Sequence, residues 1–194
     1  MKKIESFIIT AILTFAVAKG QFTKIGGGLT YGTGFHFNNE TAGVLADLNK
    51  GPFIGLFVTG TYKLNLPVRI APSFTYFITR TNKVSQVGGE ESRRVSLMMF
   101  DLNGHWIFQS LDWVEFYVLG GLDISFARRK VIGSSSSEND NAIGLNMGAG
   151  TSLKLTEKLN FFAEAKYILS KYDQIMLNAG VILNVKWLNK NEKP

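Results

Sequence analysis

The strongest constraint on this chain is an alternation of apolar with small or polar residues, which recurs in eight stretches joined alternately by long and short connections. In the last stretch, apolar side chains occupy every second position from Ile175 to Trp187, with Asn178, Gly180 and Asn184 between them. A period of two places each set on one face of a strand. Polar segments at 88–91 and 133–141 predict loops. The sequence therefore predicts strands at about 24–36, 52–64, 68–79, 98–106, 114–126, 143–153, 159–167 and 175–187.

The N-terminus has the composition of an export signal. Lys2 and Lys3 precede an apolar run from Ile4 to Val17, and small residues follow. This order is typical of a secretory signal peptide, and the run is shorter than the roughly 20 residues of a transmembrane helix. We expect residues 1–20 to be a signal peptide and 21–194 to form one β-barrel domain. Removal of 1–20 takes away three lysines and one glutamate, so the formal charge falls from +6 to +4.

Composition narrows the choice of function. Cysteine is absent, which excludes a disulfide framework, a thiolate metal site and a lipoprotein anchor. The sequence shows no catalytic constellation and no metal-ligand spacing, so we assign no catalytic residue, no metal and no cofactor. The mean hydropathy of +0.08 would suit a soluble protein. Strict alternation, however, hides the apolar half of a membrane barrel from any average.

The requirements of a lipid environment predict how the eight strands are arranged. Every backbone polar group in lipid must be paired within the protein, so a sheet there has to close on itself. Ten residues per strand, at about 3.3 Å each and tilted by about 40°, span about 25 Å, the height of an outer-membrane apolar band. The predicted fold is therefore all-β: a closed eight-stranded antiparallel up-and-down transmembrane β-barrel with periplasmic termini and four outer loops. Aromatic residues then form two outward girdles: Tyr62, Trp106, Phe116, Phe161 and Trp187, and Phe35, Tyr76, Phe126 and Tyr167.

A soluble, lipocalin-like ligand-binding barrel fits the same alternation if its apolar face points inward. Two features favour the membrane alternative. Glycine crowds the predicted inner face of the first and sixth strands, although glycine fills no volume in a packed core. The other feature is the C-terminal strand.

Asn178-x-Gly180-x-x-Leu183-x-Val185, with Trp187 two residues on, resembles the C-terminal signal by which outer-membrane barrels are recognised for assembly. Over its mature length, including Gly120-Gly121-Leu122, the chain resembles the small porin-like β-barrel proteins of Gram-negative outer membranes, with an eight-stranded outer membrane protein beta-barrel domain. The resemblance implies a cell outer membrane location and contact with outer-membrane lipid, lipopolysaccharide and the barrel-assembly machinery. We expect a monomer that binds no nucleic acid.

The inside of an eight-stranded barrel has room for side chains but not for an open channel. We predict a plugged interior held by an ion-pair network, because an unpaired buried charge costs several kcal/mol; a proton or ion path is the alternative. The predicted members are Lys63, Arg69, Asp101, Glu115, Asp123, Glu164 and Lys166. The expected function is a structural or interaction role without enzymatic activity.

Basic residues gather near the predicted outer loops, where arginine could bind lipopolysaccharide phosphates bidentately; a solvated rim is the alternative. The candidates are Arg80, Lys83, Arg93, Arg94, Arg128, Arg129 and Lys130. The resemblance to small outer-membrane barrels also implies a second candidate function, a lipid A-modifying barrel enzyme with acyl transfer or deacylation as its chemistry. It would need His36 beside Ser125 with Asp123 behind, at the outer rim.

Overall fold

The computed structural model describes residues 22–33, 52–64, 67–86, 89–133 and 137–185. This described part of the chain holds no helix long and apolar enough to cross a membrane. Its strands are β1 (Phe22–Gly32), β2 (Phe53–Lys63), β3 (Val68–Phe77), β4 (Arg80–Gln86), β5 (Gly89–Ser110), β6 (Val114–Val131), β7 (Ser137–Lys154), β8 (Leu159–Leu169) and β9 (Gln174–Asn184).

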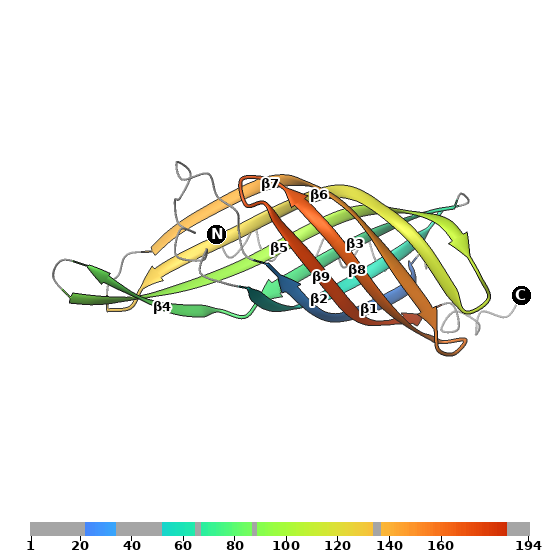
Figure 1. The fold of residues 1–194 in the computed structure, drawn as a ribbon, viewed down its shortest axis with the longest axis horizontal. Coiled ribbons are helices and arrows are strands. Elements are labelled where there is room, and N and C mark those ends of the chain that lie inside the picture. The colour runs from blue at the N-terminus through green and yellow to red at the C-terminus, as the bar shows by residue number, and fades with distance from the viewer. Residues whose placement is uncertain (1–21, 34–51, 65–66, 87–88, 134–136, 186–194) are drawn as a thin grey trace, which may run out of the picture.

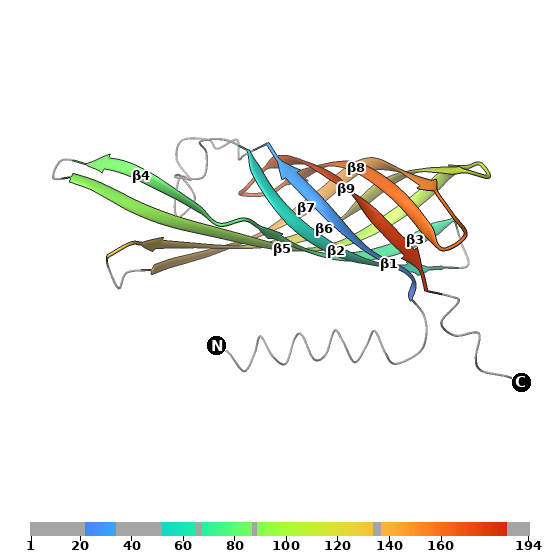
Figure 2. The same cartoon turned by 90° about the horizontal axis from the view of Figure 1, so that it is seen from below.

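The strands close into a barrel. All neighbours are antiparallel, β1 pairs with both β2 and β9, and β3 pairs with β5. β4 also pairs with β5, so β3 and β4 are two segments of one long strand broken at residues 78–79. The result is a closed eight-stranded antiparallel barrel, which confirms the predicted fold. Figures 1 and 2 show its tilted strands.

The two ends of the barrel differ. At the short-turn end, β1 begins, β9 ends, and brief connections join β2 to β3, β5 to β6 and β7 to β8. At the opposite loop end, β4, β5, β6 and β7 project well beyond the other strands (Figures 1 and 2). Their lengths explain the projection: β5 has 22 residues and β6 and β7 have 18 each, against 11 for β1 and β9.

This projection corrects the prediction of a polar loop at 133–141. Residues 137–141 belong to β7 and pair with β6 from Phe126 to Lys130. Similarly, residues 89–91 lie in β5 and pair with β4. Polar side chains do not prevent strand pairing, because an antiparallel sheet can have a face in contact with water. The first strand ends at Gly32, and residues 34–36 lie outside the described residues.

The apolar face points outward. Val118, Leu145 and Leu183 are 39%, 52% and 49% exposed, whereas Asn146 and Asn178, which occupy the other face, are 3% and 7% exposed. A soluble barrel that holds its core inside would show the reverse. The lipocalin-like alternative is therefore wrong. Predicted girdle residues at both ends, including Trp106 and Phe126, are among the exposed side chains.

Glycine has a specific role where the barrel closes. Gly28 of β1 and Gly180 of β9 are register partners on the inner face. A Cβ atom on Gly28 would lie 2.5 Å from the Gly180 Cα atom, closer than a side chain permits. These two glycines let the first and last strands approach each other, which explains part of the inward glycine pattern.

Candidate functional site

The loop-end half of the lumen is filled with apolar side chains. This apolar plug contains the edge-to-face pair Phe53 and Phe77, whose ring centroids lie 6.0 Å apart, and Tyr172 from the β8–β9 connection. The Arg80 guanidinium lies 5.1 Å from the centroid of the Phe53 ring. The other members are Val95, Leu97, Met99, Ala127, Ala142, Ile168 and Met176.

A polar contact fastens the apolar plug to β7 outside the girdle. The Asp140 carboxylate accepts hydrogen bonds from Lys171 Nζ at 2.6 Å and from the Tyr172 hydroxyl. Burial raises the pKa of Asp140, but the hydrogen bonds from Lys171 and Tyr172 and the Lys171 charge outweigh it and hold the pKa below its usual value. Burial and the bond to Asp140 raise the pKa of Tyr172.

The middle of the lumen contains a buried ion pair. Lys166 of β8 lies with its Nζ atom 2.8 Å from Asp101 Oδ2 of β5, and both side chains are almost fully buried. Asp101 also accepts hydrogen bonds from Asn146 Nδ2 at 2.8 Å and from the Ser73 hydroxyl at 3.0 Å. Four strands therefore meet through one carboxylate.

A second carboxylate adjoins this pair. Asp123 of β6 is the register partner of Asp101 and is fully buried. It accepts a hydrogen bond from Ser125 at 2.8 Å, and its Oδ2 atom has no hydrogen-bond partner among the described residues. Burying two carboxylates near one ammonium group makes the lysine essential to local charge balance.

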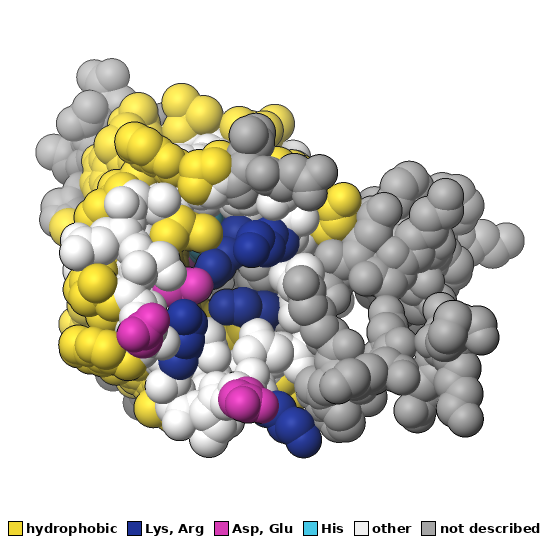
Figure 3. Space-filling model, turned by 90° about the vertical axis from the view of Figure 1, so that its right-hand side faces the viewer, with side chains coloured by type: hydrophobic (Ala, Val, Ile, Leu, Met, Phe, Trp, Pro, Cys, Tyr) yellow, Lys and Arg dark blue, Asp and Glu magenta, His cyan; other side chains and the backbone are white. Residues whose placement is uncertain are grey.

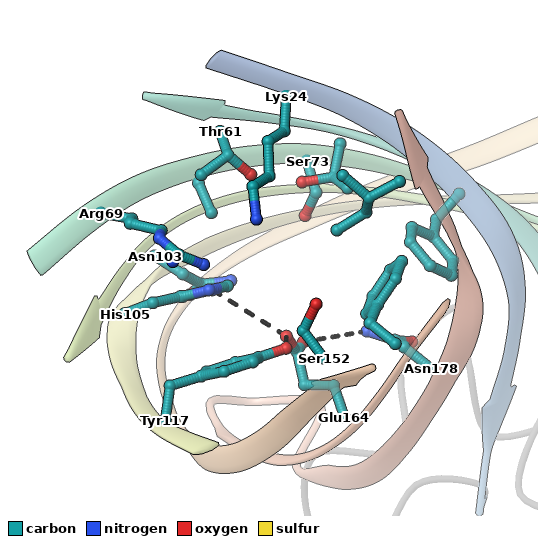
Figure 4. Close-up of a pocket in the computed structure, with 15 residues that line it drawn as sticks. Lys24, Thr61, Arg69, Ser73, Asn103, His105, Tyr117, Ser152, Glu164 and Asn178 are labelled. Carbon is teal, nitrogen blue, oxygen red and sulfur yellow. Dashed lines mark hydrogen bonds and ion pairs between the residues drawn. The ribbon is translucent and has the colours of Figure 1, made fainter. Parts of the chain in front are cut away.

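A polar cavity lies in the short-turn half of the lumen (Figure 4). On one wall, Glu164 of β8 accepts hydrogen bonds from the Tyr117 hydroxyl and from Asn178 Nδ2, both at 3.2 Å. His105 Nε2 lies 3.9 Å from the same carboxylate, and its ring stacks on Tyr117 with centroids 4.6 Å apart. Gly150 makes room for this stack, since a Cβ atom there would lie 2.5 Å from the Tyr117 ring.

Two basic side chains lie at the mouth of the cavity, at the short-turn end of the barrel. Lys24 of β1 and Arg69 of β3 reach into it, in Figure 4, from the side opposite Glu164. Arg69 Nη2 lies 2.8 Å from Glu115 Oε2, and Lys24 Nζ lies 3.8 Å from the same oxygen. Figure 3 shows Lys and Arg side chains gathered around a hollow at this end of the molecule.

The family follows from comparison with known proteins. The family model for the outer membrane protein beta-barrel domain matches residues 7–187. This chain belongs to that family. It is an integral β-barrel protein of the cell outer membrane, as the C-terminal strand and the alternation predict. No match was found among curated proteins.

Solved outer-membrane barrels share the fold at low sequence identity. Ail of Yersinia pestis is 16% identical with a TM-score of 0.52, and the match covers 82% of this chain and 94% of Ail. The N-terminal barrel of Pseudomonas aeruginosa OprF is 18% identical with a TM-score of 0.53, covering 84% and 98%. Neisserial surface protein A is 13% identical with a TM-score of 0.54, covering 86% and 99%. Ail has also been solved with the heparin analogue sucrose octasulfate.

The seven residues predicted to form an interior network do not form one cluster. Lys166 pairs with Asp101, Arg69 pairs with Glu115, and Asp123 bonds to Ser125. Glu164 is held by neutral donors, and Lys63 is exposed at the end of β2. Sequence analysis missed Lys24 as a lumen residue. Its position in the period-two pattern, opposite Ile25, could have identified it.

The basic residues predicted to contact lipopolysaccharide lie on both faces of the sheet. Arg94, Arg128 and Lys130 point outward and are exposed, and Arg94 is the register partner of Lys130. Arg93 and Arg129 lie on the lumen side, where Arg129 pairs with Glu138. Arg80 lies over the Phe53 ring, and Lys83 is in β4, where no side chain beyond residue 81 is described.

The two remaining predictions concern the C-terminal assembly signal and the candidate catalytic residues. Of the assembly-signal residues, Asn178, Gly180 and Leu183 are in β9 and Val185 follows it, with its N–H donating to Thr23 O at 3.0 Å; Trp187 lies outside the described residues. His36 also lies outside them. Ser125 is 1% exposed and donates to Asp123 inside the lumen, so it does not stand at the outer rim, where the lipid A-modifying mechanism would need it.

Proposed function

We propose that this protein has a structural or interaction role in the outer membrane, with a lumen closed by side chains and an outer sheet that binds lipopolysaccharide. The short-turn end would face the periplasm. The apolar plug supports closure, because it fills the loop-end half of the lumen with buried side chains such as Phe77, Leu97 and Met176. An apolar constriction of this kind disfavours water and ions.

One observation carries the lipid proposal. Phe126, Arg128 and Lys130 follow one another on the outer face of β6, and Arg94 lies across from Lys130 on β5. Along this face an aromatic girdle residue is followed by exposed cations. This order is typical of the boundary between the hydrocarbon and the phosphates of the lipid headgroups. Arginine binds such phosphates bidentately. The sulfated ligand of Ail is likewise a polyanion, bound by a protein of the same fold.

The test compares the two faces of the same sheet. Arg94→Gln, Arg128→Gln and Lys130→Gln, combined, should lower the amount of lipopolysaccharide that co-purifies with the protein. The control combines Arg93→Gln with Arg129→Gln, on the lumen side, and should leave the lipid content near the wild-type level. Unchanged lipid in the outward variant, or equal loss in both, would reject lipopolysaccharide binding at this patch.

Assembly and oligomeric state form the rest of the proposal. We propose that the assembly machinery recognises β9, whose inner face carries Asn178 and Gly180 and whose outer face carries Leu183. The barrel would act as a monomer. A cross-linking experiment in outer membranes tests both points, since it should trap β9 with the machinery and yield no homodimer.

A further inference from the structure

The short-turn mouth of the barrel has an excess of positive charge. Lys63, Arg69 and Lys154 each act electrostatically on Lys24 there, and Glu115 is the acidic group that acts on it. Figure 3 shows basic side chains, with some acidic side chains among them, around the corresponding hollow. Counting Glu164 of the cavity wall as well, four cations lie near two carboxylates, and a bound anion would neutralise the remaining positive charge.

The cavity below the mouth is rich in hydrogen-bond donors. Lys24 and Arg69 line it together with Asn103 and Thr61. Asn103 accepts a hydrogen bond from Asn146 at 2.9 Å through its Oδ1 atom, and its side chain lines the cavity. The amide nitrogen of such a side chain can donate hydrogen bonds to a ligand or water that accepts.

The acidic wall of the cavity does not compete for these donors. Glu164 already accepts hydrogen bonds from Tyr117 and Asn178, and the His105 ring lies 3.9 Å from its carboxylate. The cavity volume is about 30 Å³. One water needs about 10–15 Å³ on this scale, so the space suits a small ion and not a bulky solute.

We propose that this cavity binds a phosphate-type oxyanion that enters from the short-turn end, with Lys24 and Arg69 as its charged ligands and Asn103 as a neutral donor. Arginine and lysine together with an amide provide the charge-assisted bonds that such oxygens accept. Glu115 is the resident competitor, because it occupies Arg69 in the absence of the anion. The site lies at the opposite end from the lipopolysaccharide patch and does not depend on it.

Isothermal titration of the refolded full chain with inorganic phosphate, in zwitterionic detergent at low salt, tests the proposal. Lys24→Gln and Arg69→Gln should each weaken binding by at least about tenfold, the effect of losing one charged hydrogen bond. Glu115→Gln should tighten binding, because it frees Arg69. Lys24→Arg should restore most of the affinity.

Lys158→Gln is the matched control, because Lys158 is an exposed cation at the same end that does not line the cavity. It should change binding less than twofold. Folding of each variant is checked by the difference in gel migration between boiled and unboiled samples. Absence of phosphate binding by the wild type overturns the proposal, as does equal weakening by Lys158→Gln. Glycerol phosphate, titrated in parallel, distinguishes a free ion from the end group of a larger molecule; binding of either with the same dependence on Arg69 supports the site.

Discussion

The buried pair of Lys166 and Asp101 allows the sharpest prediction about stability. Lys166→Met keeps most of the side-chain volume but leaves Asp101, and the adjacent Asp123, without their buried ammonium partner. Breaking a buried ion pair by removing one partner costs about 3–5 kcal/mol. Asp101 keeps its bonds to Asn146 and Ser73, so we expect the lower end, about 3 kcal/mol, which is more than a hundredfold in the folded-to-unfolded ratio.

Urea unfolding of the barrel in lipid vesicles, followed by tryptophan fluorescence, measures this loss. The control Lys154→Met removes an exposed cation and should change the free energy of unfolding by less than about 1 kcal/mol. The double variant Lys166→Met with Asp101→Leu should recover much of the loss, because no charge of the pair remains unpaired. A loss below about 1 kcal/mol for Lys166→Met would refute the argument from buried charge.

Two further predictions concern packing and pH. Gly150→Ala places a methyl group against the Tyr117 ring and should destabilise the barrel by about 1–3 kcal/mol. The control Gly104→Ala should not, because the nearest atom to its added methyl group is 3.6 Å away. Thermal unfolding compares the two variants, and equal effects would contradict the packing argument. Because its folded-state pKa is lowered, Asp140 stabilises the loop end above its unfolded pKa, and this contribution is lost as the pH falls through the folded pKa. Amide exchange at Tyr172, after correction for intrinsic rates, should therefore become faster at acid pH in the wild type but not in Asp140→Asn, and a pH-independent rate in the wild type would count against the contact.

Period-two alternation is sufficient to predict most of the fold from the sequence. It placed Val118, Leu145 and Leu183 outward and Asp101, Glu115 and Glu164 inward, because each inference depends only on strand parity. Contacts between strands depend on the register of each strand pair, and the alternation within one strand does not specify that register. For that reason the Asp101 and Asp123 adjacency and the division of the lumen into apolar and polar halves were not predictable.

Strand ends were the weakest prediction for a related reason. Residues 137–141 are polar, so no alternation with apolar residues marks them as a strand; their pairing with β6 depends on the neighbouring strand. Lys24 shows the opposite case. Its position next to Ile25 would have given the correct face, but its role at the cavity mouth appears only when Arg69 and Glu115 from other strands lie beside it.

Spin labels on single cysteines test the central claim, that the apolar face meets hydrocarbon while the charged face lines the lumen. The chain has no cysteine, so Val118→Cys, Leu145→Cys and Leu183→Cys each give one labelling site in an otherwise unchanged protein. In reconstituted bilayers, oxygen, which concentrates in lipid, should relax all three labels strongly, and a water-soluble nickel complex should hardly affect them. Strong relaxation of these labels by the nickel complex, with little effect of oxygen, would contradict the account.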